Sequence, residues 1–181
     1  GLEELNKRTN PGLAQLGNVS GLTGKAISAY HLGFVLGPCL NATGRLETAD
    51  AGVELLRAKD ESEALFLANR LKELNEIRKE KTVKGIDKAI DIIEYSEQKN
   101  DNVLLVYLSN CHESLAGIIA GKLKERYNKP TLVFTDSNHD DQILKGSGRS
   151  VDCYNMFEEL CKCSDHIIKF GGHPMAAGLT I

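Results

Sequence analysis

Residues 169–178 read Lys169-Phe170-Gly171-Gly172-His173-Pro174-Met175-Ala176-Ala177-Gly178. The two adjacent glycines let the backbone adopt a positive φ or approach a ligand closely, which a Cβ would obstruct. Pro174 fixes φ directly after His173 and removes one backbone donor. Successive glycine N–H groups in such a turn can form an anion-binding concavity, with the imidazole as a titratable donor beside it. A tight turn with a structural histidine is the alternative, because glycine pairs are common in turns.

The residues upstream of this stretch, from Val103 onward, follow the pattern of an α/β domain. Val103–Leu108 and Thr131–Phe134 are continuous apolar runs, which are typical of buried strands. A helical pattern lies between them, with Ser114 as a candidate N-cap, and this order predicts a right-handed βαβ unit. The expected elements are strands over 103–108, 131–134 and 142–150 and helices over 115–127 and 155–163, after which Ile167–Phe170 leads into the glycine turn.

The first 58 residues predict short helices that are broken by glycine. Asn10-Pro11 favours a helix that begins at Gly12, because proline is tolerated in the first turn. The other expected elements are a helix over Gly24–Leu36 that Thr23 caps and Gly37-Pro38 ends, a loop over 39–46, and a helix from about Thr48 to Arg57.

A long amphipathic helix is expected from about residue 61 to about residue 98, with Asp60 as its N-cap. Gly85 is a point against an unbroken helix, because glycine costs roughly 1 kcal/mol relative to alanine. A continuous helix would span about 55 Å, which exceeds the width of a small domain and favours a connector between two bodies. The predicted fold is α/β, with a helical segment over 1–58, a connecting helix over 59–99, and a domain over 100–181 whose mixed sheet is flanked by helices.

Composition limits the classes of function. The formal charge is -3 and the pI about 6.0, so any phosphate site must be local rather than part of an overall positive field. Five cysteines without framework spacing indicate a reducing compartment, and Cys161, Cys163 and His166 lack the usual zinc-site spacing. The sequence has neither a signal-peptide pattern nor a membrane-spanning run, which predicts a soluble cytoplasmic protein. A start without methionine inside a helical pattern, and an end at Ile181 inside an apolar strand, suggest a piece of a longer chain.

Two polar clusters lie at the ends of expected elements in different parts of the chain, where functional sites concentrate. Asn41 and Arg45 fall in the loop over 39–46, where the guanidinium can bind a phosphate. A turn cap and a surface ion pair are the alternatives for these two residues. His112 follows the first strand at its carboxyl end, which is where ligands of open α/β sheets bind.

Two further clusters lie near the end of the chain. Ser147 and Arg149 share one side of the third strand, among small residues that let a phosphate approach. The other is the Gly171-Gly172-His173 turn described above. His139-Asp140-Asp141 has the residue types of a metal site. A flexible polar loop is favoured instead, because neighbouring side chains on an extended chain point in different directions.

Four separated stretches together resemble the RecJ family of bacterial exonucleases, a branch of the DHH/DHHA1 phosphoesterases. Their order and spacing match the family over essentially the whole length, and the long helix lies where the family has one. The resemblance covers the end of a DHH domain, the connecting helix and most of a DHHA1 domain. The stretches are Leu36-Gly37-Pro38-Cys39-Leu40-Asn41-Ala42-Thr43-Gly44-Arg45-Leu46, His112 with Gly117-Ile118-Ile119, Lys145-Gly146-Ser147-Gly148-Arg149-Ser150, and Phe170–Gly178.

The resemblance implies metal-dependent 5′-to-3′ hydrolysis of single-stranded DNA, in DNA repair and recombination. It implies Mn²⁺ or Mg²⁺ held by an upstream DHH domain, a 5′-phosphorylated single strand as substrate, and a single-stranded-DNA-binding protein and a helicase as partners. The roles carried over by motif are as follows: Ser147 and Arg149 hold the 5′-terminal phosphate, His173 with Gly171 and Gly172 reaches the substrate phosphate as the catalytic residue, Asn41 and Arg45 contact the strand or shape the cleft, and His112 lines it. No metal ligand is expected in this chain.

The sequence also departs from the family pattern. Cys39 stands where the family often has arginine, Thr43 replaces an alanine, and Asn110-Cys111 replaces the more usual Gly-Trp. Because the metal-binding motifs of the family would lie before Gly1, the chain alone is expected to be inactive. The alternatives are a DHH–DHHA1 phosphodiesterase that acts on oligoribonucleotides or cyclic dinucleotides, and a single-strand-binding module without chemistry.

Overall fold

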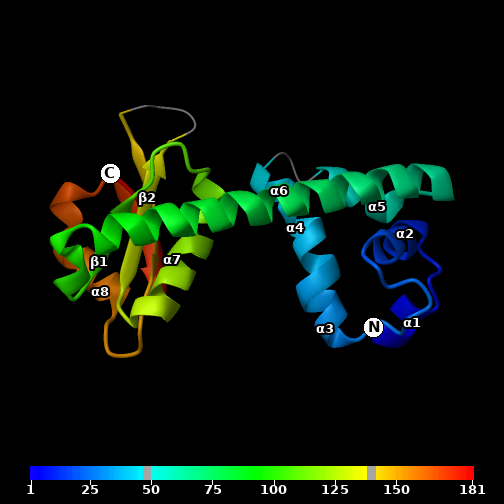
Figure 1. Ribbon diagram of the computed structural model, residues 1–181, viewed down its shortest axis with the longest axis horizontal. Coiled ribbons are helices and arrows are strands. Elements are labelled where there is room, and N and C mark those ends of the chain that lie inside the picture. The colour runs from blue at the N-terminus through cyan, green and yellow to red at the C-terminus, as the bar shows by residue number, and fades with distance from the viewer. Residues whose placement is uncertain (47–49, 138–141) are drawn as a thin grey trace. The chain divides into compact units, whose positions relative to one another are not determined.

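The computed structural model describes residues 1–46, 50–137 and 142–181. The chain divides into two compact units, unit 1 over Gly1–Glu80 and unit 2 over Lys81–Ile181. Unit 1 is helical and unit 2 is built on a five-stranded mixed sheet with helices, so the predicted α/β class is confirmed (Figure 1). In the part of the chain that is described, no helix has the length and apolarity to cross a bilayer. The finer division at residues 58 and 99 stays a prediction.

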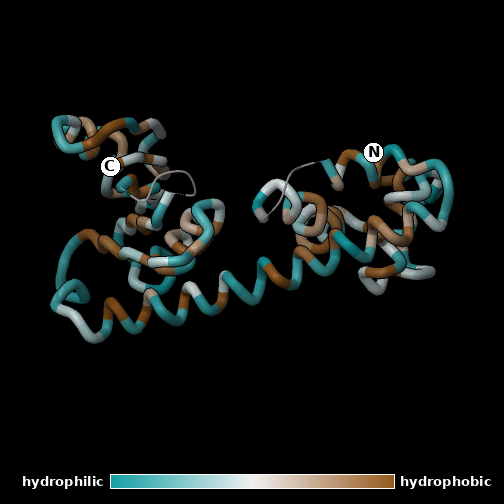
Figure 2. The backbone as a smooth tube through the Cα atoms, turned by 90° about the horizontal axis from the view of Figure 1, so that it is seen from above, coloured by the Kyte–Doolittle hydropathy of each residue, from teal (hydrophilic) through white to brown (hydrophobic). Residues whose placement is uncertain are grey.

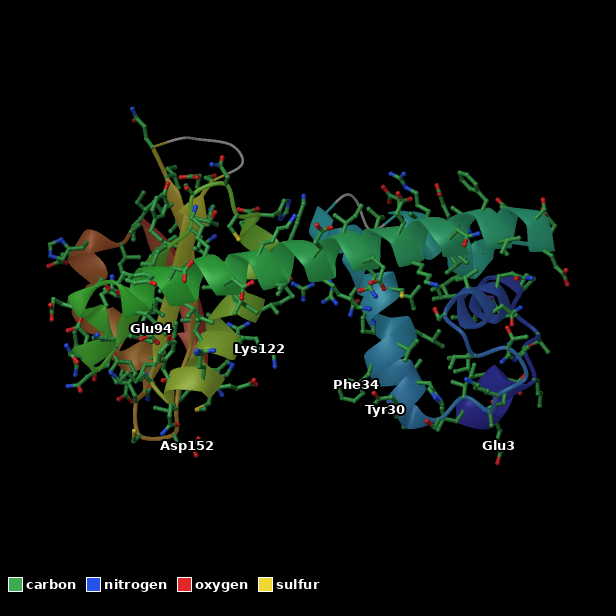
Figure 3. All side chains as sticks on the ribbon, in the orientation of Figure 1. Glu3, Tyr30, Phe34, Glu94, Lys122 and Asp152 are labelled. Carbon is green, nitrogen blue, oxygen red and sulfur yellow. The ribbon has the colours of Figure 1, made fainter. Side chains whose placement is uncertain are left out.

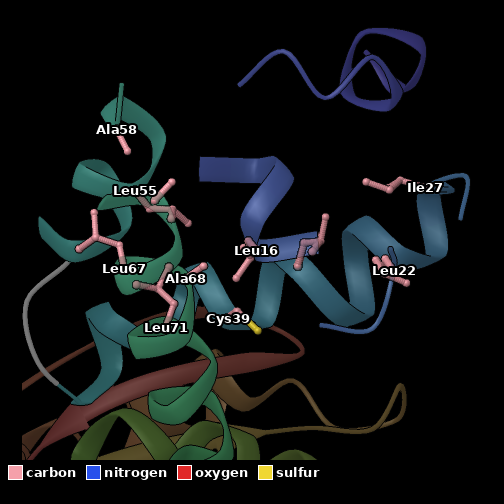
Figure 4. Close-up of a cluster of buried hydrophobic side chains, with 11 residues drawn as sticks. Leu16, Leu22, Ile27, Cys39, Leu55, Ala58, Leu67, Ala68 and Leu71 are labelled. Carbon is pink, nitrogen blue, oxygen red and sulfur yellow. The ribbon is translucent and has the colours of Figure 1, made fainter. Parts of the chain in front are cut away.

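Unit 1 packs short helices around one apolar cluster. Asn10 caps α2 by accepting from the backbone N–H of Leu13 at 2.9 Å, so the helix start at Asn10-Pro11 is confirmed. The cluster draws Leu16, Cys39 and Leu55 together with residues of α6 (Figure 4). The elements are α1 (Leu2–Asn6), α2 (Pro11–Val19), α3 (Ala29–His31), the π-helical η1 (Leu32–Leu36), α4 (Gly37–Leu46), α5 (Asp50–Arg57) and the beginning of α6 (Glu61–Glu94).

The helix expected to end at Gly37-Pro38 continues through it. The chain is helical from Ala29 to Leu46, and the π-helical turn η1 directly precedes Gly37-Pro38. A proline inside a helix clashes with the carbonyl four residues earlier, and π-turns are one way in which a helix accommodates such a local disruption. The expected loop over 39–46 is therefore wrong: these residues belong to α4. The start near Thr48 of the next helix lies outside the described residues.

The long helix is unbroken over Glu61–Glu94. The Asp60 carboxylate caps it by accepting from the backbone N–H groups of Ser62 at 3.0 Å and Glu63 at 2.9 Å. A Cβ at Gly85 would lie 2.6 Å from Ile119 Cδ1, so the glycine that lowers helix propensity lets α7 pack close to α6. Apolar positions recur along α6 between polar ones (Figure 2). The helix ends before the expected residue 98, and a short 3₁₀ turn, η2 (Glu97–Asn100), follows.

Unit 2 holds the sheet in the order β1-β2-β3-β5-β4, with β1 and β2 parallel and the other pairs antiparallel. One core joins α6, β1, α7 and β2, and a second joins α8 to the other face of the sheet. The elements are β1 (Leu104–Tyr107), α7 (Glu113–Tyr127), β2 (Thr131–Asp136), β3 (Leu144–Arg149), α8 (Met156–Lys162), the 3₁₀ turn η3 (Ser164–His166), β4 (Lys169–His173) and β5 (Ala176–Thr180).

Two expectations for the first strand of unit 2 and its helix are wrong in detail. β1 is buried on one face only, since Leu105 is 52% exposed and Tyr107 46% exposed. Its run of apolar residues therefore does not mark a strand covered on both faces. The N-cap of α7 is His112 rather than Ser114, and the helix begins at Glu113.

Candidate nucleic-acid interface

Three rows of side chains cross β3, β5 and β4 on one face of the sheet. Residues paired directly across an antiparallel ladder place their side chains on the same face. The rows are the arginine row Arg149–Ala176–His173, the glycine row Ser147–Gly178–Gly171, and the lysine row Lys145–Thr180–Lys169. The structure therefore brings the predicted residues Ser147, Arg149, Gly171 and His173 to one face.

α7 packs on this face of the sheet over β2 and β3. Arg149 lies against α7, because a Cβ built at Gly117 would be 2.8 Å from Arg149 Nη2 and one at Gly121 would be 3.9 Å from its Cγ. Its Nη1 donates to the Gly148 carbonyl at 2.7 Å. Two glycines of α7 thus leave room for the guanidinium, which lies half-buried between helix and sheet.

The paired glycines lie in a strand and not in a turn, which corrects the first expectation. Gly171 and Gly172 belong to β4, and neither has a positive φ. A Cβ at Gly172 would meet the Ala176 carbonyl oxygen at 2.4 Å, so this glycine is required by the approach of β5. A Cβ at Gly171 would meet no atom within 4 Å. The chain's own packing therefore requires only one of the two glycines.

His173 ends β4 on the exposed edge of the sheet. Its Nδ1 accepts from the backbone N–H of Met175 at 3.3 Å, which orients the ring across the turn to β5. Nε2 is then the nitrogen turned away from this contact, and the side chain is exposed. A histidine held in this way can present one ring nitrogen to a ligand.

The sequence reasoning missed the lysine row. Lys145 Nζ donates to Thr180 Oγ1 at 3.1 Å, and Lys169 is exposed at the edge strand. The missed signal is a shared period of two: residues 145–149 carry lysine, serine and arginine at alternate positions, and residues 169–173 carry lysine, glycine and histidine. Because β5 lies between β3 and β4 and is antiparallel to both, these two patterns run in the same direction and align row by row.

His112 lies elsewhere in unit 2, at a cavity of about 480 Å³ between α6 and the loop after β1. Its Nδ1 accepts from the backbone N–H of Ser114 at 3.3 Å and lies 2.8 Å from Ser114 Oγ, so it has a structural role as the N-cap of α7. At the same cavity Asp136 accepts from the Tyr107 hydroxyl and, at 3.2 Å, from the backbone N–H of Asn110. These two donors hold the pKa of Asp136 below its ordinary value, the hydroxyl contributing most.

Asn41 and Arg45 lie in unit 1 on α4, where Asn41 is exposed and Arg45 half-buried. Sequence reasoning did not identify Arg78 on α6 as their neighbour. Burial, followed by the like charge of Arg45, lowers the pKa of Arg78 from its ordinary value. The Arg45 and Arg78 guanidinium groups therefore lie within electrostatic reach of each other, and the Glu76 carboxylate acts on Arg78 in the opposite direction.

The described residues do not provide a metal site: they contain no group of three His, Cys, Asp or Glu side chains placed to hold an ion. Cys161, Cys163 and His166 are exposed on and after α8. His139, Asp140 and Asp141 lie outside the described residues. We therefore derive no metal-dependent step from this chain's own side chains.

Comparison with known proteins shows what these units are similar to. The DHHA1 domain family matches residues 100–181. The single-stranded-DNA-specific exonuclease RecJ of Bacillus subtilis is 38% identical over 181 residues, covering 100% of this chain and 23% of the relative. The protein of the same name from Escherichia coli is 37% identical and is covered over 31% of its length.

Solved structures agree with the sequence relatives. The crystal structure of RecJ from Thermus thermophilus in complex with Mg²⁺ matches 100% of this chain with a TM-score of 0.85 and 26% identity, and the chain covers 27% of that protein. The complex with Mn²⁺ gives a TM-score of 0.84. The chain thus spans about a quarter to a third of the length of its curated relatives. Over its whole length the chain is homologous to this part of the RecJ exonucleases, and residues 100–181 match the DHHA1 domain family.

Proposed function

We propose that this chain grips the substrate in a RecJ-type single-stranded-DNA exonuclease, with Ser147 and Arg149 at the 5′-terminal phosphate and His173 at the neighbouring phosphate. The observation that carries the proposal is the arginine row, in which β5 connects Arg149 and His173 on one face. Two strand spacings separate them by roughly 10 Å at the backbone. The exposed His173 and the half-buried Arg149 guanidinium beside α7 would each contact a phosphate of one strand that runs along the part of this face that α7 leaves open.

The chemistry of the rows suits phosphate. The Arg149 guanidinium offers a planar fork of donors, and the Ser147 hydroxyl adds a neutral donor two residues away on the same face. In the glycine row, Gly178 and Gly171 contribute no side chain, so a strand can approach the backbone there. Asn41 and Arg45 would contact the strand from unit 1, and His112 would line its path on unit 2.

We further propose that hydrolysis by the whole enzyme uses Mn²⁺ or Mg²⁺ held outside this chain. The two named RecJ structures contain Mg²⁺ and Mn²⁺, whereas the donor set for such an ion is missing from the described residues. The purified chain with Mn²⁺ is therefore expected to leave single-stranded DNA intact. Metal-dependent degradation that follows the chain through purification would contradict this assignment.

The test is the binding of short single strands that differ only at the 5′ end. We expect tighter binding of a 5′-phosphorylated tetranucleotide than of its 5′-hydroxyl counterpart, and an affinity that falls with salt with a slope of about −0.7 per phosphate contact. Arg149→Gln should abolish the preference, whereas Arg126→Gln, on the exposed last turn of α7, should keep it. Equal affinity of the unaltered chain for the two strands would refute the proposed pocket. A ribose strand included beside the deoxyribose strand reports whether an oligoribonucleotide is the better ligand.

A further inference from the structure

The cavity at His112 is lined on one side by lysines of α6. Lys81, Lys84 and Lys88 lie at i, i+3 and i+7, which places them within an arc of about 60° on one helix face. Lys88 Nζ donates to Ser109 Oγ at 3.2 Å, so this side chain reaches across to the loop after β1. All three belong to unit 2, as does the opposite wall.

Positive charge dominates the described lining of this cavity. Its described residues include the three lysines and one carboxylate, Asp136. Both Asp136 oxygens are already occupied, one by the Tyr107 hydroxyl and the other by the Asn110 backbone N–H. Asp136 is within electrostatic reach of Lys88 and offsets part of the positive charge. The described lining still has more ammonium groups than carboxylates, so an anion that enters the cavity meets a net attraction.

The rest of the lining fits an organic phosphate rather than a bare ion. Leu108 and Leu115 provide an apolar floor, and Ser109 and Asn110 provide polar groups at the rim. The cavity volume of about 480 Å³ lies within the range of roughly 300–1,000 Å³ that is typical of small-ligand pockets. A sugar or a base attached to the phosphate therefore has both space and an apolar surface.

The cavity adjoins the lysine row of the sheet. Lys145 pairs with Thr135 across β3 and β2, and the Thr135 hydroxyl donates to the carbonyl of Cys111, which lines the cavity. The lysine row and the lysines of α6 are therefore linked within unit 2 through Thr135 and Cys111. Single-strand-binding surfaces commonly use a positively charged track along the backbone.

We propose that Lys81, Lys84 and Lys88 form a second phosphate site, which binds an internal phosphodiester of the strand whose 5′ end is held on the sheet. The identity of the strand rests on the proposed function; the phosphate chemistry of the cavity does not. The site adds affinity for strands long enough to extend from the sheet to α6. It does not contribute to recognition of the terminal phosphate.

The experiment compares a tetranucleotide with a dodecanucleotide, each with a 5′-phosphate or a 5′-hydroxyl, by fluorescence anisotropy on the full chain. The variant is Lys81→Gln/Lys84→Gln/Lys88→Gln, since glutamine preserves helix propensity on α6. We expect it to lose the extra affinity for the dodecanucleotide and to lower the salt slope by about 2, from three contacts of about 0.7 each. Its preference for 5′-phosphate on the tetranucleotide should remain.

The matched control removes the same charge elsewhere in unit 2, at positions outside the cavity. It is Lys99→Gln/Lys122→Gln/Lys162→Gln, three exposed positions of which Lys122 is labelled in Figure 3. If the control loses as much affinity for the dodecanucleotide as the α6 variant, the loss reflects net charge and the proposed site is overturned. Unchanged dodecanucleotide binding by the α6 variant would also overturn it. If the unaltered chain shows no preference for 5′-phosphate, the pocket on the sheet is refuted. The difference in affinity between dodecanucleotide and tetranucleotide would still test this cavity.

A final arm distinguishes the source of the phosphate. Thymidine monophosphate is titrated into the isotope-labelled chain, and the amide resonances of Ser109 and Asn110 are followed. We expect the dodecanucleotide to shift them at concentrations where the mononucleotide does not. Shifts that saturate with the mononucleotide at those concentrations would overturn the assignment to a strand and identify a mononucleotide site.

Discussion

The two adjacent glycines of β4 should respond in opposite ways to the same substitution. A Cβ at Gly171 would meet no atom within 4 Å, whereas a Cβ at Gly172 would lie 2.4 Å from the Ala176 carbonyl oxygen and 2.7 Å from the Ala177 Cα. The second set of contacts is with backbone, which cannot rotate away as a side chain can. Gly172→Ala should therefore damage the hairpin, and Gly171→Ala should leave the fold intact.

These contacts set the expected changes in stability and in strand affinity. Overpacking against fixed atoms costs typically 1–3 kcal/mol, and a loss of about 2 kcal/mol from unit 2 would lower its Tm by roughly 10 °C. Gly171→Ala removes backbone freedom from the unfolded chain at a φ that alanine can adopt, which stabilises by about 0.4–1 kcal/mol. It also places a methyl group in the glycine row, where the phosphate must approach. A cost of about 1.4 kcal/mol at that contact would weaken strand binding tenfold.

Thermal unfolding and anisotropy with the 5′-phosphorylated tetranucleotide separate the two effects. The control is Gly33→Ala, an exposed glycine of η1 in unit 1 whose Cβ also meets nothing within 4 Å. We expect unaltered strand binding in the control. If Gly171→Ala binds the strand as tightly as the unaltered chain, the glycine row does not contact phosphate. If Gly172→Ala unfolds at the normal temperature, the close approach of β5 does not constrain that position.

Three shorter predictions test other contacts. Gly117→Ala places a methyl group 2.8 Å from Arg149 Nη2, a movable group, so it should reduce the 5′-phosphate preference with little change in Tm; a large loss of Tm would contradict this. Tyr107→Phe should raise the pKa of Asp136 in an NMR titration, because it removes the hydroxyl that stabilises the carboxylate. Since the folded-state pKa of Asp136 is lowered, the variant should be less stable than the unaltered chain above the unfolded pKa of about 3.9, and this difference should vanish as pH falls through the folded value. Burial raises the pKa of the Cys39 thiol, so a thiol reagent at neutral pH should modify it far more slowly than the exposed cysteines, which are Cys153, Cys161 and Cys163.

Local pattern was sufficient for most elements because their signals are short-range. The Asn10 and Asp60 caps and the strand at 131–134 depend on residues within a few positions of one another, and the structure has each of them. The expected stop at Gly37-Pro38 failed for a physical reason. A helix can continue past a proline when a wider turn precedes it, and neither composition nor period reveals that turn.

Burial was harder to predict than element type. The apolar run at β1 is consistent with a strand covered on both faces, yet Leu105 and Tyr107 are exposed because α7 and α6 cover only the other face. Tyr30 and Phe34 are also apolar residues that remain exposed: their rings stack with centroids 5.0 Å apart on the surface of unit 1 (Figure 3). A sequence states which side chains are apolar, but the number of covering elements decides which of them are buried.

The candidate site required information that no single stretch contains. Ser147 and Arg149 could be placed on one side of their strand from the period of two alone. Their relation to Gly171 and His173 depends on β5, which follows β4 in the chain but is inserted between β3 and β4 in the sheet. That insertion makes β3 and β4 run in the same direction, so Lys145 aligns with Lys169 and Arg149 aligns with His173 through β5. Had β4 paired directly with β3 as an antiparallel neighbour, Lys169 would lie across from Arg149 and His173 from Lys145, and no row would carry both Arg149 and His173. The sheet order, more than any motif, is therefore what brings the candidate residues of two separate strands to one face.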